Sequence, residues 1–305
     1  MSPANSPPGF ADHLCKSLRH LRMDHHSAPL QQDPDGTDKL YFLKCANGDN
    51  GRLMVEGEFN AQGELYKTMP ERKTYFFLSE FINMSGRVPE PNQLCTKLAR
   101  LHRDSVSPTG MFGFHATTCQ GITPQDVSWE LNGVWEDLNI LAERALELVI
   151  PRLIGALEAE GRRVKPCLIH ADLWEGNTGT SLETGRIHIF ESAAFYAHNE
   201  METGNWRCTY NKIHNKVYTL TYLRHFAPSE PRQEWDDRNR MYSVYYNVIY
   251  SVNHKSQGAA VRQTAYDDLY YLVDKSAPFE EGRGPQRLVE SDRARLSDER
   301  DHTRA

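Results

Sequence analysis

The chain has 305 residues, of which 39% are apolar, and carries a net charge of −6 at neutral pH. This length suits one large domain or two lobes around a shared cleft. The acidic balance argues against a nucleic-acid partner, which would need a basic stripe, and no apolar run reaches the ~18 residues of a membrane span. The six cysteines form no Cys-x-x-Cys pair and the first ten residues have no apolar signal-peptide core, so we expect a cytoplasmic protein with reduced thiols.

The chain begins with a polar stretch and then becomes apolar. Residues 1–38 are polar with scattered prolines, and we expect this N-terminal segment to be poorly ordered. Residues 39–82 predict a small, β-rich unit. Its expected elements are a buried strand over 40–45, a helix over 52–67 and an apolar strand over 74–81.

The remainder of the chain is mainly helical in pattern. Between residues 83 and 279, most apolar positions recur at helical spacing. The expected helices cover 88–102, 134–160 (divided at Pro151), 200–226, 236–254 and 262–275. Residues 280–305 contain many charges and almost no apolar side chains, which predicts a disordered, charged tail.

One motif interrupts the helical half. The apolar run Cys167–Ile169 predicts a buried strand, and His170, Asp172 and Asn177 follow it. This spacing is typical of the catalytic loop of a phosphoryl-transfer enzyme, in which the aspartate accepts the proton of the attacking hydroxyl and the asparagine reaches a magnesium ion on the nucleotide. Gly176 would permit the tight turn between them. The alternative interpretation is an ordinary Asx-type turn between two buried strands.

A second triplet in the chain serves as a control. His102-Arg103-Asp104 has the same outer residues, but Thr109 stands where the asparagine would be needed. The residues before it have helical rather than strand spacing. We therefore interpret this triplet as the polar end of a helix.

The second metal ligand is expected at the end of the next strand. Arg186–Phe190 alternates polar and apolar residues, as a half-buried strand does. Kinases carry an aspartate after this strand, whereas this chain has Glu191. No aspartate occurs between Gly176 and Asn205, and of the glutamates there only Glu191 follows the strand directly.

A lysine on a predicted buried strand indicates a nucleotide site. Burial of an ammonium group is costly unless it is paired, and in kinase-like folds the strand lysine contacts ATP phosphates and is held by a helix glutamate. Lys44 and Glu58 fit this pair, with Glu56 as the alternative partner; otherwise the lysine extends to solvent at a strand edge. Glu80 and Ile82 would form a hinge whose backbone binds the adenine edge.

These elements predict an α+β fold with two lobes, like that of protein kinases. The N-lobe (39–82) is small, truncated and β-rich, and the C-lobe (83–279) is mainly helical and holds the catalytic loop. ATP would bind in the cleft between them. No Gly-rich phosphate loop precedes Lys44, because only Gly9 and Gly36 occur there.

The catalytic segment resembles that of a known family. Residues 170–177 (HADLWEGN) resemble the H-G-D-L-W-x-G-N loop of the fructosamine/ketosamine kinases, which belong to the aminoglycoside-phosphotransferase branch of the protein-kinase-like fold. Trp174 is the distinguishing residue. Residues 189–196 and 197–202 are similar to the family's I-F-D-P-A-x-F-Y and G-D-R-E-M-D segments.

The resemblance implies ATP- and Mg²⁺-dependent phosphorylation of the sugar 3-hydroxyl of ketosamines. Such substrates are ribulosamine and fructosamine adducts on protein lysines or small amines, and the phosphorylated adduct is unstable and releases the amine. The implied roles are Asp172 as catalytic base, Asn177 as catalytic residue and metal ligand, Glu191 as metal ligand, Lys44 and Glu58 as the ATP-positioning pair, and Trp174 and His170 as substrate-side residues.

The chain also departs from the family pattern. Glu191 replaces an aspartate, and the added methylene matters because Mg²⁺ demands tight octahedral geometry. Ala171 replaces a glycine, and the stretches 67–74 and 127–135 are short for the family. These departures leave three alternatives open: a catalytically impaired protein of kinase fold, a kinase of another small-molecule hydroxyl, and a structural helical protein without a nucleotide site.

Overall fold

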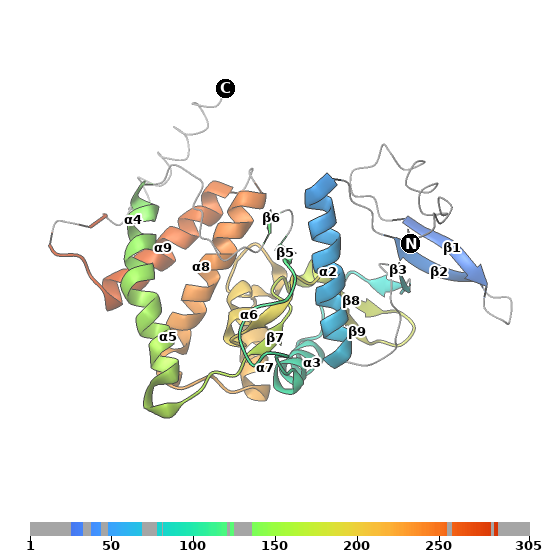
Figure 1. The fold of residues 1–305 in the computed structure, drawn as a ribbon, viewed down its shortest axis with the longest axis horizontal. Helices are drawn as coiled ribbons and strands as arrows, with labels where there is room; N and C mark the ends of the chain where they lie inside the picture. Colours follow the sequence, from blue (N-terminus) through green and yellow to red (C-terminus); the bar gives the residue numbers. More distant parts are fainter. Residues whose placement is uncertain are drawn as a thin grey trace, which may run out of the picture.

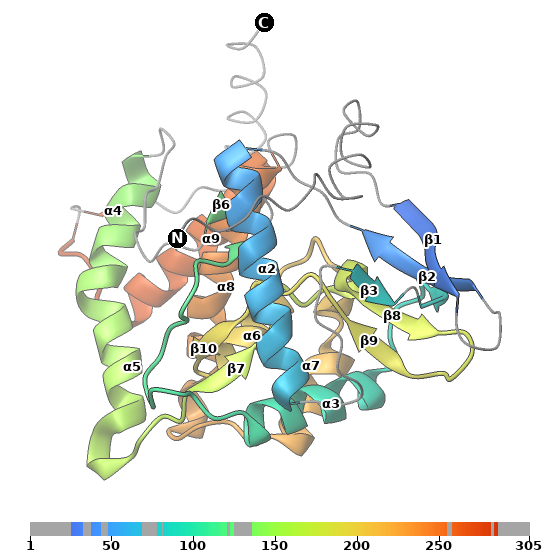
Figure 2. The same ribbon diagram turned by 45° about the vertical axis from the view of Figure 1, so that its right-hand side comes forward.

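The computed structural model describes residues 26–32, 38–43, 48–68, 78–80, 82–120, 123–124, 136–254, 258–281 and 284–285. Strands β1–β3 lie at one end of the molecule and helices α4, α5, α8 and α9 at the other, with α2 between them (Figure 1). The view turned by 45° keeps this order (Figure 2). Lys44 and most of the expected disordered tail lie outside the described residues.

The first sheet has three antiparallel strands in the order β1-β2-β3: β1 (His26–Gln32), β2 (Asp38–Leu43) and β3 (Leu78–Glu80). The predicted strands over 40–45 and 74–81 are confirmed in β2 and β3. Within residues 1–38, which we expected to be poorly ordered, the structure describes one strand that the sequence did not predict, β1. Its sequence shows no apolar alternation and contains Pro29, which suppresses a strand prediction. As an edge strand whose register shifts after Pro29, β1 can accommodate the proline.

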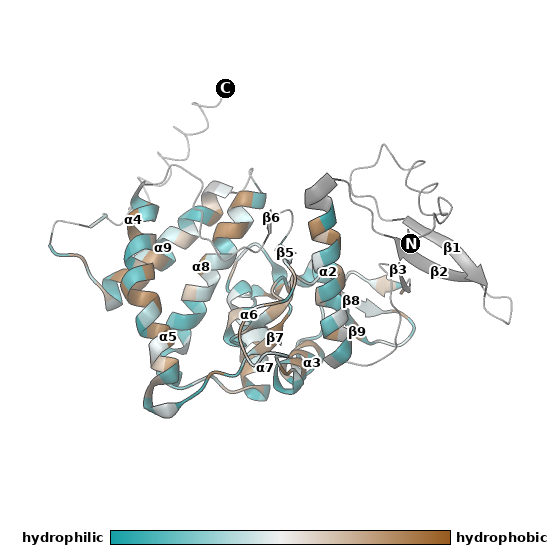
Figure 3. Cartoon of the chain, viewed as in Figure 1, coloured by the Kyte–Doolittle hydropathy of each residue, from teal (hydrophilic) through white to brown (hydrophobic). Residues whose placement is uncertain are grey.

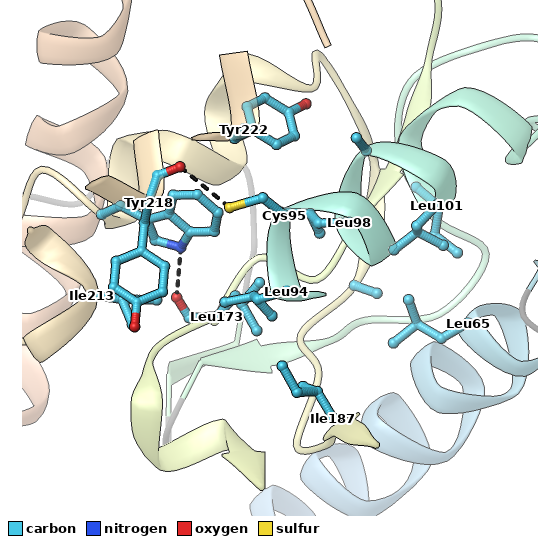
Figure 4. Close-up of a cluster of buried hydrophobic side chains, with 14 of the residues drawn as sticks. Leu65, Leu94, Cys95, Leu98, Leu101, Leu173, Ile187, Ile213, Tyr218 and Tyr222 are labelled. Carbon is cyan, nitrogen blue, oxygen red and sulfur yellow. Dashed lines mark hydrogen bonds between the residues drawn. The ribbon is translucent and has the colours of Figure 1, made fainter. Parts of the chain in front are cut away.

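Helix α2 (Gly48–Thr68) confirms the predicted helix over 52–67, and α3 (Pro91–Asp104) confirms the one over 88–102. The Glu90 carboxylate caps α3 by accepting hydrogen bonds from the backbone N–H groups of Asn92 (2.9 Å) and Gln93 (2.7 Å). Both helices contribute leucines to one hydrophobic core, shown in Figure 4, which includes Leu65, Leu94, Leu98, Leu101, Leu173, Ile187, Ile213, Tyr218 and Tyr222.

The short strands of the middle of the chain form separate small sheets. β7 (Cys167–Ile169) pairs antiparallel with β10 (Phe195–Ala197), and β8 (Thr178–Ser181) lies between β4 (Met84–Ser85) and β9 (Ile187–Ile189). A further pair joins β5 (Cys119–Gln120) to β6 (Thr123–Pro124). All three residues of β7 are buried, as the apolar run predicted. The predicted strand after residue 186 is confirmed in β9.

The helical lobe follows the predicted periodicity with two differences. α4 (Glu136–Arg144) continues through a π-helical turn (Ala145–Val149) into α5 (Ile150–Glu158). The chain therefore stays helical through Pro151, and the expected division is a change of helix type just before the proline. The single helix expected over 200–226 is instead α6 (Glu200–Asn205) and α7 (Lys216–His225). The Asn215 side chain caps α7 by accepting from the Val217 N–H (3.1 Å), which starts a new helix there.

α8 (Trp235–Asn253) and α9 (Gly258–Ser276) confirm the last two predicted helices. They pack with α4 and α5 around a second core that includes Leu138, Leu141, Val149, Leu153, Val244, Leu269 and Leu272. Apolar and polar residues alternate around these helices in Figure 3. Within the described ranges, no helix has both the length and the apolar character that a membrane crossing requires.

Candidate active site

One buried carboxylate holds the backbone of the loop that follows β7. The backbone N–H groups of His170 and Ala171 both donate to Glu202 on α6, the second across 3.2 Å, and Glu202 is fully buried. Hydrogen bonds to a charged acceptor are stronger than neutral ones, so this contact holds the loop firmly. Ala171 has φ +65°, in the left-handed region where the family carries glycine.

Asp172 lies between two side-chain amides. Asn177 Nδ2 donates to Asp172 Oδ2 (3.1 Å) and to its backbone carbonyl (2.8 Å), while Gln120 Nε2 donates to Oδ1 (3.1 Å). The structure therefore brings Asp172 and Asn177 together as the motif predicted. Gln120 comes from β5, outside the motif, and has no counterpart among the predicted site residues.

The surroundings of Asp172 suit a general base. Burial raises the pKa of Asp172 to about 6; the hydrogen bonds from Gln120 and Asn177 oppose this shift, and the negative charges of Glu191 and Glu202 add to it. A base with a pKa near the working pH combines a deprotonated ground state with useful proton affinity. The arrangement can orient a hydroxyl group and accept its proton.

His170 supports the loop from within. Its ring is fully buried; Nε2 lies 3.0 Å from the Phe190 carbonyl, and Nδ1 accepts from the Asp172 N–H (3.3 Å). These partners assign the proton to Nε2. Burial lowers the pKa of His170, which favours the neutral ring. One ring nitrogen joins the loop to the end of β9 and the other accepts within the loop. The assignment of His170 to the substrate side stays a prediction.

Glu191 stands beside this loop. The Phe190 N–H donates to the Asn177 carbonyl (3.1 Å), which makes Asn177 and Glu191 near neighbours. The charge of Glu191 raises the pKa of both Asp172 and His170, as a nearby carboxylate does. Glu191 has φ +55°, an unfavourable backbone conformation for a residue with a side chain.

The oxygen atoms of Asn177 and Glu191 fit Mg²⁺. Because Asn177 Nδ2 is turned to Asp172, the amide oxygen is left for another partner. Mg²⁺ is usually held by one or two protein oxygens together with phosphate oxygens and water. In the part of the chain that the structure describes, no three His, Cys, Asp or Glu side chains gather into a complete metal site.

Trp174 covers the glycine of the loop. A Cβ atom on Gly176 would lie 2.3 Å from the indole ring, so a larger residue here would require the ring of Trp174 to shift. The neighbouring Leu173 carbonyl accepts from Trp206 Nε1 (3.1 Å), a bond drawn in Figure 4, which anchors the loop to the core. Trp174 keeps 38% of its surface exposed, enough to contact a ligand.

The nucleotide side is described in part. Glu58 is half-buried on α2, whereas Glu56 is exposed and pairs with Arg52 (3.5 Å), so of the two predicted partners for Lys44 only Glu58 is partly buried. Gln62 lies one helical turn after Glu58, on the same face. Gln62 Nε2 donates to the Ile189 carbonyl (3.4 Å), and Gln62 Oε1 accepts from the Ser192 hydroxyl (3.2 Å). This face of α2 therefore points to the strand end that carries Glu191.

The predicted hinge residues occupy the end of the first sheet. Glu80 is the last residue of β3, and Ile82 follows two positions later with a half-buried side chain. Sequence reasoning missed Gln120 and Glu202 as site residues. The resemblance of residues 197–202 to the family segment offered a signal for Glu202, whereas nothing in the sequence marked Gln120.

Two solved structures share this architecture. A putative fructosamine-3-kinase from Haemophilus somnus superposes with a TM-score of 0.57 at 16% identity, covering 86% of this chain and 96% of that one. One from Thermobifida fusca has a TM-score of 0.52 at 17% identity, covering 82% and 93%. These similarities confirm the predicted α+β, two-lobed kinase-like fold.

Sequence comparison gives the family. The mouse ketosamine-3-kinase is 34% identical over 242 residues, covering 62% of this chain and 76% of that protein. A chloroplastic protein-ribulosamine 3-kinase from Oryza sativa (indica) is 29% identical over 198 residues, covering 56% of this chain. The match spans only 57% of the rice protein's length. The sequence model of the fructosamine kinase family matches residues 39–257, and the chain belongs to this family.

Proposed function

We propose that this protein transfers the γ-phosphoryl group of ATP to the 3-hydroxyl of a ketosamine. The observation that carries the proposal is the buried Asp172 carboxylate, held by Gln120 and Asn177 in a loop whose Trp174 is shared with the family pattern. The names of the mouse and rice relatives support this acceptor class. Ribulosamine or fructosamine adducts on lysines are the substrates we propose, and their removal would be a deglycation reaction.

In this proposal each residue has a role that its position supports. Asp172 accepts a hydrogen bond from the substrate 3-hydroxyl, orients its oxygen toward the γ-phosphate and takes its proton as transfer proceeds. Asn177 fixes the Asp172 carboxylate through Nδ2 and offers its amide oxygen, with Glu191, to Mg²⁺. When bound, the ion would neutralise charge on the β- and γ-phosphates.

The nucleotide-binding roles are part of the same proposal. Lys44 would contact the α- and β-phosphates and would be held by Glu58, which lies on the face of α2 that meets the site. The backbone at Glu80 and Ile82 would bind the adenine edge. Trp174 would pack against the sugar or its amine and attract a cationic amine through its ring.

The test is a phosphoryl-transfer assay with γ-labelled ATP and ribulosyl-lysine, comparing the wild type with Asp172→Asn. This substitution keeps the shape of the side chain but removes its proton affinity. We expect the rate to fall roughly 10²- to 10⁴-fold. Equal rates for the two proteins would eliminate Asp172 as the base.

A second candidate is a kinase-fold protein that binds nucleotide but turns over slowly. The specific observation is Glu191, which replaces the family's aspartate and adopts φ +55°. A shift of about 1 Å in a reacting group can cost on the order of 10²-fold in rate. Glu191→Asp should therefore raise the rate if the glutamate limits metal positioning. An unchanged or lower rate would contradict the assignment of Glu191 to the metal.

A further inference from the structure

One polar atom beside the proposed base has no partner among the described residues. Gln120 is 8% exposed and uses its Nε2 to donate to Asp172. The Oε1 atom of the same amide is buried and receives no hydrogen bond from any residue that the structure describes. A buried acceptor without a hydrogen bond costs about 1–3 kcal/mol in desolvation. A ligand that donates a hydrogen bond to Oε1 would recover this free energy on binding.

The orientation of this amide is fixed. A carboxylate only accepts hydrogen bonds, so Nε2 must face Asp172 and Oε1 must point away from it. The Gln120 backbone is held as well, because Asn253 Nδ2 donates to its carbonyl (3.0 Å) and Gln120 pairs with Thr123 across β5 and β6. Two residues earlier, the Thr118 hydroxyl donates to the Ala193 carbonyl (3.1 Å). The position of Oε1 is thus set before any substrate binds.

The charge around Oε1 favours a cation. Asp172 is in direct contact with Gln120, and the carboxylates of Glu191 and Glu202 act on Asp172. Acidic groups attract an ammonium group.

We propose that Gln120 Oε1 accepts a hydrogen bond from the substituted amine of the substrate, and that this contact selects ketosamines over free sugars and ethers. The inference rests on the proposed function, because it places the substrate 3-hydroxyl on Asp172. In a ketosamine, three carbons separate the 3-oxygen from the amine nitrogen, a span of roughly 4–5 Å. Oε1 lies within about 5 Å of Asp172 Oδ1, since the two ends of an amide are roughly 2 Å apart. One substrate can therefore reach both groups.

The experiment compares two acceptors that differ in one atom: an N-alkyl ribulosamine and the 1-O-alkyl ribulose ether. The ether keeps the shape and the 3-hydroxyl but has no donor for Oε1. We expect the wild-type kcat/KM to be roughly 10- to 100-fold higher for the amine. In Gln120→Met, which has similar length and no hydrogen bond, this ratio should fall to near unity.

If Gln120 only orients Asp172, the substitution should change the rates for both substrates equally. Gln120→Met would then lower kcat for the amine and the ether by the same factor and leave their ratio at the wild-type value, which would overturn the inference. Gln120→Glu is the matched variant, since it keeps an acceptor oxygen and should retain preference for the amine even where its rate is low. Loss of that preference in Gln120→Glu also counts against the inference.

The wild type alone separates the inference from the proposed function. Phosphorylation of both acceptors with equal kcat/KM would overturn amine recognition by Gln120 and leave the kinase activity standing. No phosphorylation of the ribulosamine would overturn both. If the methionine variant fails to fold, which its thermal unfolding curve would reveal, the amine-to-ether ratio of Gln120→Glu decides the question in its place.

Discussion

The chain contains two His-x-Asp triplets, and they end in different surroundings. In the first, Asp104 ends α3 with its side chain 46% exposed and lies next to Arg100 (3.3 Å). In the second, Asp172 follows a strand and is enclosed by amides from Gln120 and Asn177. The comparison shows that the triplet alone does not form the site. Residues distant in the sequence, such as Gln120, decide whether the aspartate is buried and how its carboxylate is oriented.

The two triplets also share one support. The first triplet ends α3, as predicted, and its His102 is fully buried, with Nδ1 2.7 Å from the Tyr222 hydroxyl and Nε2 3.6 Å from Glu202. Glu202 accepts the backbone N–H of His170 from the second triplet. The histidine of each triplet is buried and hydrogen-bonded, whereas the two aspartates differ in exposure.

The sharpest way to break the comparison is to change the two aspartates in parallel. Asp172→Asn should lower kcat roughly 10²- to 10⁴-fold, because the base is lost, while Asp104→Asn should leave kcat unchanged. The measurement is steady-state phosphorylation of ribulosyl-lysine. A large loss in the Asp104 variant would mean that the first triplet has an active role.

Removal of the shared support should weaken the whole fold. Glu202→Ala leaves the N–H groups of His170 and Ala171 without their acceptor and should lower the free energy of unfolding by about 3 kcal/mol. Denaturant titration measures this. Asp104→Ala is the control on the exposed ion pair and should change the free energy by less than about 1 kcal/mol.

Lowering the pH should destabilise the protein next to α6, the helix that carries Glu202. His198 precedes α6 and is 7% exposed; burial lowers its pKa to about 4 from an ordinary 6.5. Below pH 6.5 His198 is protonated in the unfolded chain but stays neutral in the folded chain. The free energy of unfolding therefore falls as the pH drops from 6.5 toward 4. At pH 5 the loss is about 2 kcal/mol. His198→Gln should flatten this part of the curve of unfolding free energy against pH; an unchanged slope would contradict the assignment.

The smallest expected effect concerns the middle residue of the second triplet. Ala171→Gly removes a side chain from a position with φ +65°. The relief of backbone strain exceeds the added freedom of the unfolded chain, so we expect a gain of roughly 0.5–1 kcal/mol in unfolding free energy. Arg103→Gly, at the equivalent place inside α3, should instead destabilise the protein by about 1 kcal/mol.

Local patterns predicted the parts of the molecule that depend on near neighbours. The buried strand β7, the loop to Asn177 and the strand β9 follow from short runs of residues, and each is found where expected. The edge strand β1 was missed because its pairing with β2, and not its own composition, makes it a strand. The division between α6 and α7 was missed for a different reason: hydrophobic periodicity does not detect the side-chain cap at Asn215 that starts α7.

The site residues that escaped prediction act over long sequence distances. Gln120 reaches Asp172 from 52 positions away, and Glu202 reaches His170 from 32 positions away. No spacing rule covers such pairs, because their separation is set by how the intervening segments pack. The predicted pair Lys44–Glu58 stays a prediction, since Lys44 lies outside the described residues.

The side chain of Gln62 has a mechanical consequence. It joins α2 to both sides of Glu191, through the Ile189 carbonyl and the Ser192 hydroxyl. A tilt of α2 must either carry Glu191, the proposed metal ligand, with it or break both bonds. If the proposed function holds, a movement of α2 toward a nucleotide would therefore also shift this ligand.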